Sequence, residues 1–453
     1  MRKCRVAVAV IAFAVFAFSI CAADDHSGSA PAGQTPSSGA SASSATSTSA
    51  PAATHHVTAY TLPPALYKKA RDRSRINFRL ALISFVYGVV VLWLILRWKF
   101  SVAFRNWAEK VSSRRFLQAL VFSPLLVLTV AFFTLPVDIY SEVIEKQFGI
   151  SVQGWGSWSW DWIKAQLISL VIFTLLIWIL YVVIRRSPRR WWLYFWLVSL
   201  PILIFVFFIS PWVIAPLFNK FEPLQQKDAP LTAALEQMEQ RAGEDIPPER
   251  MFWMGAAEKT TALNAYVTGM GASKRIVVYD TTVAKMNTPQ IVFVVGHETG
   301  HYVLQHVPKE IAFFAVLLLI LFYLGYRLVS WMLGRWGAGW QIRGLDDWAS
   351  LPVLMLLLSI LLFLTNPIAS AVSRHFEHQA DQFGLEVTHG LTPDSGQVAA
   401  QAFQVLGEVD LADPDPNPLD VFLFYSHPTI SDRIQFALTY DPWAQGGHGE
   451  FVK

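Results

Sequence analysis

The sequence predicts a mainly α-helical protein that crosses a membrane about six times and carries a small α+β domain outside the lipid. Three observations support this fold class. Of the 453 residues, 53% are hydrophobic and only 15% are charged, whereas soluble domains carry about 25% charged residues. Several apolar runs are long enough to cross a bilayer, which takes about 20 residues per helix. The remaining polar residues gather into two blocks that can fold in water.

The charge and cysteine content exclude several classes of protein. The net charge is only +3, from 36 basic and 33 acidic residues, without the basic stripe that a nucleic-acid-binding protein carries. Both cysteines, Cys4 and Cys21, lie in the first 21 residues. The rest of the chain therefore cannot form an intrachain disulfide, a cysteine-based zinc finger or a cysteine nucleophile.

The N-terminal 60 residues have the pattern of an export segment and a tether. Three basic residues precede the apolar residues 6–20, and the small residues Cys21-Ala22-Ala23 follow them. This pattern predicts a signal peptide over residues 1–23, with an uncleaved signal anchor as the alternative. Residues 24–60 are rich in Ser, Ala, Thr and Pro. We expect them to be a disordered tether, because they cannot bury enough apolar surface to offset their conformational entropy.

The apolar runs divide the rest of the chain. Four of them form an N-terminal membrane region within residues 61–215, and two more occupy residues 311–372. Tryptophans gather before the third run and open the fourth, as in the aromatic belts at membrane surfaces. The six predicted spans are residues 80–96, 116–137, 162–184, 191–212, 311–331 and 351–372.

Basic residues between the runs predict how the chain crosses the membrane. The loops after the first, third and fifth runs carry Lys and Arg, so the positive-inside rule places these loops in the cytoplasm. The predicted signal agrees, because it places residue 24 on the opposite side. The two polar blocks, residues 216–310 and 373–453, are then expected outside the cytoplasm. One basic cluster before the first run opposes this orientation, namely Lys68, Lys69, Arg71, Arg73 and Arg75.

Periodicity predicts local elements within the two polar blocks. Residues 229–242 have helical spacing, and residues 275–279 form a β-branched run typical of a strand. An amphipathic helix is predicted over residues 288–305, with Asn287 as its start signal. Residues 373–388 and 394–406 are also predicted to be helical.

The helix predicted over residues 288–305 contains His297-Glu298-Thr299-Gly300-His301. Residues four apart share one helical face, so both imidazoles can bind a single Zn²⁺. Glu298 can then take a proton from a metal-bound water as that water attacks a carbonyl. A chance match is the alternative, but such a match would rarely fall inside an apolar helix. His306 lies five residues beyond His301, on another face of a continuous helix, and is expected at the surface.

A catalytic zinc needs a third protein ligand and one open position. Glu377 and Asp381 lie directly after the last apolar run and, being four apart, share a helical face. One carboxylate could bind zinc while the other accepts a hydrogen bond from a ligand imidazole. His375 and His378 are alternative ligands by spacing, and a solvated charged helix end is the alternative without metal.

From about residue 60 to residue 438 the chain resembles the type I CAAX prenyl endopeptidases. These are integral-membrane HExxH metalloproteases of the gluzincin type, and they include the yeast enzyme that processes a mating factor. Several stretches carry the resemblance in the same order as in the family. They are Leu62-Pro63-Pro64-Ala65, residues 211–221, Asn264-Ala265-Tyr266, residues 274–281, the HExxH motif, residues 373–381, Tyr425-Ser426-His427-Pro428 and Arg433-Ile434.

The resemblance implies a role for each matched residue. Glu377 takes the place of the third zinc ligand, and Asp381 that of the carboxylate that supports the ligands. His427 matches a histidine that stabilises the oxyanion of the reaction. Arg433 matches an arginine that orients His427 or the ligand carboxylate. Residues 264–266 match an edge strand that pairs with the substrate backbone.

These patterns predict an integral-membrane zinc metalloendopeptidase that binds one Zn²⁺ per chain through His297, His301 and Glu377. Residues 216–310 and 373–453 are then two parts of one catalytic domain. The expected substrates are extended peptides or membrane-associated proteins, and not nucleic acids. A broad quality-control protease is one alternative. A scaffold or transporter with a structural zinc is another, although a structural site does not need the base Glu298.

The chain departs from the family at its N-terminus, where the signal-like segment takes the place of a membrane span. This segment and the charge pattern predict a bacterial inner-membrane protein with its active site on the periplasmic side. A prenylated substrate is not expected there.

Overall fold

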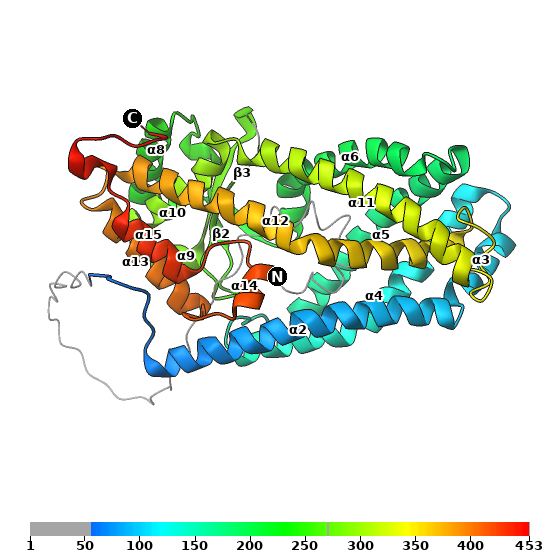
Figure 1. Cartoon of the computed structure of the whole chain (residues 1–453). Coiled ribbons are helices and arrows are strands. Elements are labelled where there is room, and N and C mark those ends of the chain that lie inside the picture. Colours follow the sequence, from blue (N-terminus) through cyan, green and yellow to red (C-terminus); the bar gives the residue numbers. More distant parts are fainter. Residues whose placement is uncertain (1–55, 270, 453) are drawn as a thin grey trace.

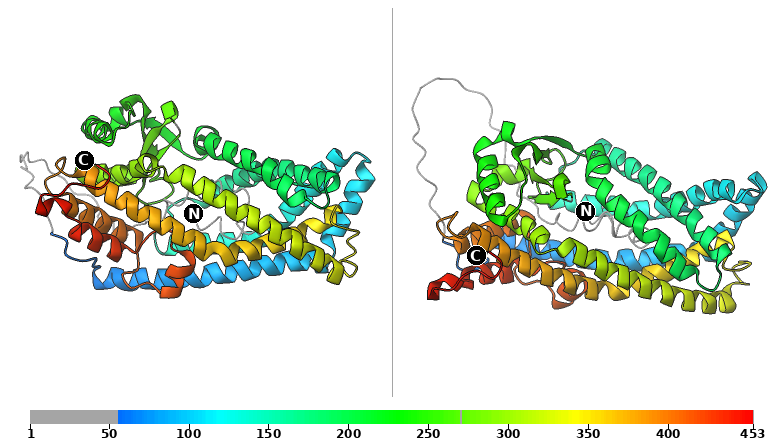
Figure 2. Two further views of the ribbon diagram at one scale, coloured as in Figure 1. Left: turned by 45° about the horizontal axis from the view of Figure 1, so that its top comes forward. Right: turned by 90° about the horizontal axis from the view of Figure 1, so that it is seen from above.

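The computed structural model describes residues 56–269 and 271–452, so the predicted signal segment and nearly all of the tether lie outside the described residues. Long helices run side by side along one axis (Figures 1 and 2). A small sheet and the short helices gather towards one end, and α3 (Phe100–Val111) lies at the other. The long helices are α2 (Pro64–Arg97), α4 (Arg115–Gln147), α5 (Trp155–Arg186), α6 (Trp191–Ile209), α11 (His306–Trp336) and α12 (Leu351–Thr388).

The described residues contain six helices with the length and hydropathy of membrane spans, which confirms the six predicted spans. α6 continues through a π-helical and a 3₁₀ turn as far as Leu217. Apolar side chains such as Phe132 and Val171 are 68% and 71% exposed, as expected where a side chain contacts lipid. The longest span covers 41 residues, about twice the minimum of about 20. The long helices therefore extend beyond the lipid and can position groups outside it.

The extension of α2 joins the bundle to the polar end of the molecule. Arg73 of α2 lies 3.0 Å from Glu145 of α4 and donates a hydrogen bond to the carbonyl oxygen of Asp410, at 2.8 Å. Asp410 is the last residue of α13 (Ser395–Asp410). Three residues of the basic cluster before the first span thus have acidic partners. The other two pairs are Arg71–Asp415, at 3.7 Å, and Lys68–Asp72, at 3.5 Å.

The polar block before α11 contains a four-stranded sheet with the strand order β1-β2-β4-β3. The central strands β2 and β4 are parallel, and both edge strands pair antiparallel with their neighbours. β4 is buried at every residue and has the bounds that the sequence predicts. The strands are β1 (Lys220–Pro223), β2 (Met251–Gly255), β3 (Ala265–Thr268) and β4 (Arg275–Tyr279).

The helix α10 (Thr288–Val303) begins where predicted and ends two residues early. Asn287 and Gln290 exchange two hydrogen bonds, of 3.0 and 3.1 Å, in a capping box. Gln305 takes a left-handed φ of 57°, so the chain turns there and α11 begins at His306. The helix predicted over residues 373–388 is the end of α12, which continues without a break from the last span. The other short helices are α7 (Leu224–Lys227), α8 (Ala229–Ala242, as predicted), α9 (Asp280–Lys285), α14 (Pro418–Phe424) and α15 (Ile430–Thr439).

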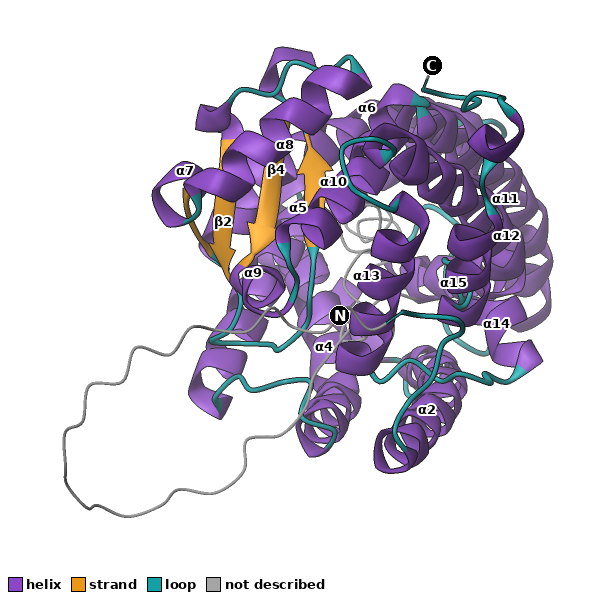
Figure 3. Cartoon of the chain, turned by 90° about the vertical axis from the view of Figure 1, so that its left-hand side faces the viewer, coloured by secondary structure: helices purple, strands orange, loops and turns teal. Residues whose placement is uncertain are grey.

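α10 lies between the sheet and α12 (Figure 3). Two glycines allow the close approach of α10 and α12. A Cβ atom on Gly300 of α10 would lie 3.0 Å from Cβ of Phe383, and one on Gly384 of α12 would lie 3.2 Å from the backbone nitrogen of His297. These distances are shorter than most Cβ contacts in proteins, so even a methyl group at either position would force its neighbours to move. The contact therefore fixes the HExxH face of α10 against the C-terminal part of α12.

We expect Gly384→Ala to lower the stability of the protein. The new methyl group would press on the His297 backbone and on the Phe293 ring, which lies 3.0 Å away. Overpacking of this kind costs about 1–3 kcal/mol. Thermal unfolding of the detergent-purified protein measures the effect. The control is Gly325→Ala in α11, because a Cβ atom there meets nothing within 4 Å. Equal melting temperatures for the two variants would contradict this account of the helix contact.

Candidate metal centre

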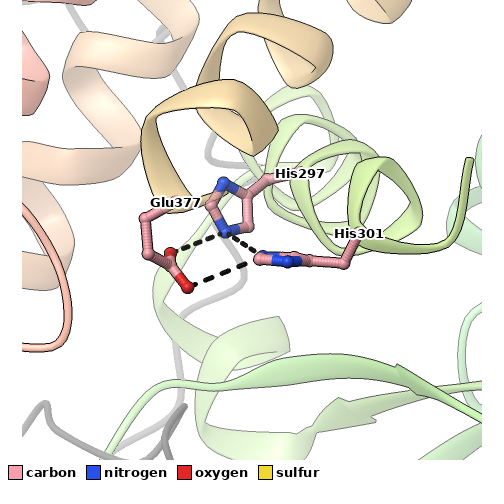
Figure 4. Close-up of side chains that lie close together, drawn as sticks. All are labelled: His297, His301 and Glu377. Atoms are coloured by element: carbon pink, nitrogen blue, oxygen red, sulfur yellow. Dashed lines mark hydrogen bonds and ion pairs between the residues drawn. The ribbon is translucent and has the colours of Figure 1, made fainter. Parts of the chain in front are cut away.

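The two histidines of the HExxH motif converge with Glu377 (Figure 4). The Nε2 atoms of His297 and His301 lie 3.3 Å apart. The carboxylate of Glu377 lies 3.2 Å from Nε2 of His297 and 3.6 Å from Nε2 of His301. α10 supplies the histidines and α12 supplies the carboxylate. Ligands about 2.0–2.1 Å from a tetrahedral Zn²⁺ lie about 3.3 Å from one another, so this donor set fits such an ion.

Asp381 contacts Nδ1 of the His297 ring, and Arg433 holds Asp381 in place. Nδ1 of His297 lies 2.8 Å from Oδ1 of Asp381. Arg433 of α15 donates two hydrogen bonds to that carboxylate, at 2.6 and 2.9 Å, and its guanidinium lies 4.3 Å from the ring of Phe403. The family resemblance implied that Arg433 orients His427 or Glu377, whereas its two short hydrogen bonds go to Asp381, and its guanidinium also lies 3.4 Å from Nδ1 of His297. The arrangement places the proton of His297 on Nδ1 and leaves Nε2 free for a metal.

The carboxylates around His297 create a strong attraction for a cation. Burial lowers the pKa of His297, but hydrogen bonds and charge from Asp381 and Glu377 outweigh burial and raise this pKa to about 10. Burial lowers the pKa of Arg433, but Asp381, Glu377 and Glu298 together outweigh burial and raise this pKa. A divalent cation can compete with the proton for the same negative field.

Glu298 and His427 flank the ligand atoms. Glu298 is nearly buried and approaches to 3.9 Å from Nε2 of His297. Nε2 of His427 lies 3.1 Å from the Glu377 carboxylate, and its side chain is 25% exposed. Arg374 of α12 donates to the carbonyl oxygen of Tyr425 at 2.6 Å, which holds the loop of His427 beside the site. One carboxylate and one imidazole are thus available for proton transfer and hydrogen bonding next to the metal position.

The three residues matched to a substrate-binding edge strand lie at the start of β3. β3 is at the edge of the sheet, and Tyr302 of α10 donates to the carbonyl oxygen of Val267 at 3.3 Å. Asn264 precedes the strand, and its backbone nitrogen donates to Thr282 at 2.7 Å. Ala265 is buried, and the Tyr266 ring contacts Tyr279 edge-on. The strand therefore lies next to the HExxH helix.

The expectation that His306 lies at the surface is wrong. His306 is fully buried, and its Nδ1 lies 3.1 Å from Nδ1 of His301. The left-handed residue Gln305 breaks the helix before it, so the face calculated for a continuous helix does not apply. The one sequence feature that could have pointed to this contact is the presence of a third histidine only five residues after the HExxH motif. His375 and His378 are exposed and lie outside the group of metal-ligating side chains found in the described residues.

A buried carboxyl group supports α10 from the side of α8. Thr299 of the HExxH motif donates a hydrogen bond to Glu239 at 2.6 Å. Glu239 is 1% exposed, and burial raises its pKa to about 7. The charged groups that act on it are Glu244, which raises the pKa, and Lys274, which lowers it. Sequence reasoning missed this contact because it joins residues 60 positions apart.

Comparison with known proteins gives matches over most of the chain. The family models "Peptidase family M48" and "CAAX prenyl protease N-terminal, five membrane helices" match residues 225–441 and 44–220. The chain is 38% identical to the uncharacterized metalloprotease YhfN of Bacillus subtilis, over 74% of this chain and 76% of that protein. It is 26% identical to CAAX prenyl protease 1 of Saccharomyces cerevisiae, over 84% and 88%. The crystal structure of S. mikatae Ste24p matches with a TM-score of 0.71 and 24% identity, over 84% of this chain and 90% of that one.

Glu239 should make stability depend on pH. Its carboxyl group has an ordinary pKa of 4.5, raised to about 7 in the folded protein. The folded state therefore binds the proton more tightly, and stability falls as the pH rises from 4.5 to 7, by about 3 kcal/mol. Glu239→Gln cannot ionise. It should unfold at a higher temperature than the original protein at pH 8 and at a similar temperature at pH 5.

Glu236→Gln on the same helix is the matched control, and thermal unfolding of the detergent-purified protein at both pH values is the measurement. A difference between Glu239→Gln and the original protein that is the same at pH 5 and pH 8 would contradict the expected titration.

Proposed function

The chain belongs to peptidase family M48 and is an integral-membrane metalloprotease, and on this premise we propose that it binds one Zn²⁺ through His297, His301 and Glu377. The resemblance to the CAAX prenyl endopeptidases is confirmed. The comparisons do not favour a quality-control protease or a non-proteolytic scaffold. The observation that carries the zinc proposal is the convergence of two imidazoles and one buried carboxylate at the distances of a tetrahedral site.

The residues around the ligands have complementary roles in this proposal. Bound Zn²⁺ supplies a Lewis acid that polarises a water molecule and the scissile carbonyl group. Glu298 accepts a proton from the attacking water and then donates it to the leaving amine. His427 donates a hydrogen bond to the developing oxyanion. Asp381 and Arg433 keep His297 in the tautomer that leaves Nε2 free.

The edge strand offers a way to bind substrate. We assign the backbone of an extended peptide to β3, with Asn264, Ala265 and Tyr266 as its contact residues. The position of β3 at the sheet edge, directly beside α10, supports this assignment. A peptide added to a sheet edge binds through main-chain hydrogen bonds. This mode selects extended segments more than particular side chains, which suits peptides or membrane-associated proteins as substrates.

The charge pattern supports an active site on the periplasmic side of a bacterial inner membrane. The basic cluster in the first turns of α2 opposed this orientation, but three of its residues pair with carboxylates of the protein. Four arginines gather at the turn from α5 to α6: Arg185 and Arg186 end α5, and Arg189 and Arg190 lie in the loop that follows. A match to a Bacillus protein also fits a bacterial source. A prenylated protein is not expected on that side. The activity named in "CAAX prenyl protease" is therefore ascribed to the relatives and not to this chain.

Glu298→Gln should abolish proteolysis and leave metal binding intact. The amide cannot take the proton of the attacking water, so we expect a loss of roughly 10²–10⁴-fold in rate. Detergent-purified protein is offered an unstructured protein and a farnesylated CAAX peptide, and zinc is measured by elemental analysis. Glu222→Gln, a half-exposed residue on the edge strand β1, is the matched control and should keep full activity. A Glu298→Gln protein that cleaves as fast as this control would exclude the assigned base.

Cysteine labelling tests the orientation. After Cys4 and Cys21 are replaced by serine, a single cysteine is introduced as Pro188→Cys, in the α5–α6 loop, or as His448→Cys, near the C-terminus. A membrane-impermeant maleimide added to spheroplasts should label only the His448→Cys protein. Labelling of the Pro188→Cys protein alone would place the metal centre in the cytoplasm.

A further inference from the structure

The second histidine of the proposed site, His301, is held by a chain of two polar side chains, His306 and Gln379. Nδ1 of His301 lies 3.1 Å from Nδ1 of His306, and Nε2 of His306 lies 3.1 Å from Oε1 of Gln379. His306 is fully buried, and its ring stacks on Phe376 at 4.6 Å with an angle of 18°. These contacts fix the position of the His306 ring and direct each of its nitrogens at one partner.

The order of donors and acceptors along this chain determines where the protons lie. An amide oxygen can only accept, so Oε1 of Gln379 requires a proton on Nε2 of His306. A neutral imidazole carries one proton, so Nδ1 of His306 is then an acceptor. It takes its hydrogen bond from Nδ1–H of His301. Nε2 of His301 is left with a lone pair, and this is the atom that faces Nε2 of His297 and the Glu377 carboxylate.

The charge of the site explains why this support is neutral. Three carboxylates and one guanidinium surround the ligand atoms, so together they leave two negative charges, which one divalent cation neutralises. A carboxylate in the place of His306 would add a third negative charge, which the divalent cation would not neutralise. A buried charge without a partner destabilises a protein. His297 has an ionic support instead, because Arg433 neutralises Asp381.

We propose that His306 and Gln379 are positioning residues, which fix the tautomer and the ring orientation of His301 for metal binding. This inference rests on the metal centre proposed above. Gln379 lies on α12 between Glu377 and Asp381. α12 therefore supplies one ligand, the direct support of His297 and, through His306 of α11, the second link in the support of His301. Side chains that support metal ligands typically contribute a factor of about 10–100 in metal affinity.

The test is the affinity of the detergent-purified full-length protein for Zn²⁺, measured by competition with a chromophoric chelator. His306→Leu fills the buried space with apolar atoms but removes the acceptor, so zinc should bind about 10–100-fold more weakly. His306→Asn places its Oδ1 where Nδ1 stood and should keep most of the affinity. Gln379→Leu frees Nε2 of His306 and should weaken binding by about 10-fold. His375→Leu, an exposed histidine on the same helix, is the control and should bind zinc as the original protein does.

The two substitutions of His306 separate a positioning role from packing. If His306 only fills space, leucine is tolerated and asparagine is the harmful change, the reverse of the expected order. The inference is overturned if His306→Leu binds zinc as tightly as the control, or if leucine and asparagine weaken binding equally in proteins with equal melting temperatures. Failure of the original protein to bind Zn²⁺ would overturn the metal centre itself. Zinc binding without differences among the variants would overturn only the role of His306.

Discussion

The close contact between α10 and α12 is the constraint on which the rest of the site depends. The three proposed ligands come from two helices, α10 and α12, and they meet beside Gly300 and Gly384, where the two backbones approach closely. α12 then carries Glu377, Gln379 and Asp381 along one turn, next to the two histidines of α10. Because the two glycines carry no side chains, α12 lies close enough to α10 to place Glu377 beside the (i, i+4) histidine pair. The three side chains then form one proposed metal site.

Buried charge is the cost of this arrangement, and pairing offsets it. Charged groups taken out of water destabilise a protein unless each has a partner. Asp381 has Arg433 and His297, and the Glu377 carboxylate has the three histidines His297, His301 and His427. The long spans add a second constraint, because their ends extend beyond the lipid and contact the polar end of the molecule, as in the hydrogen bond from Arg73 of α2 to Asp410 of α13. The position of the centre therefore follows from helix length as well as from local chemistry.

Sequence patterns predicted most of the fold and the position of the histidine pair on one helix, because both depend on local periodicity. The six spans, the strand β4, the helix α8 and the start of α10 lie where hydropathy and capping signals place them. Spacing alone did not identify the third proposed ligand, because Glu377, His375 and His378 were all candidates. The family resemblance selected Glu377. The burial of His306 and the Glu239–Thr299 contact were not predictable, because each depends on tertiary contacts and on the left-handed turn at Gln305. The partner of Arg433 was missed for the same reason, because Asp381 lies 52 residues away in the chain.

The central claim is that His297, His301 and Glu377 bind the catalytic metal together. X-ray absorption at the zinc edge of the purified protein tests it most directly, because multiple scattering from imidazole rings counts the histidine ligands. We expect two imidazoles and light oxygen ligands for the original protein, and one imidazole for His301→Leu reconstituted with zinc. A spectrum with no imidazole, or one that His301→Leu leaves unchanged, would contradict it.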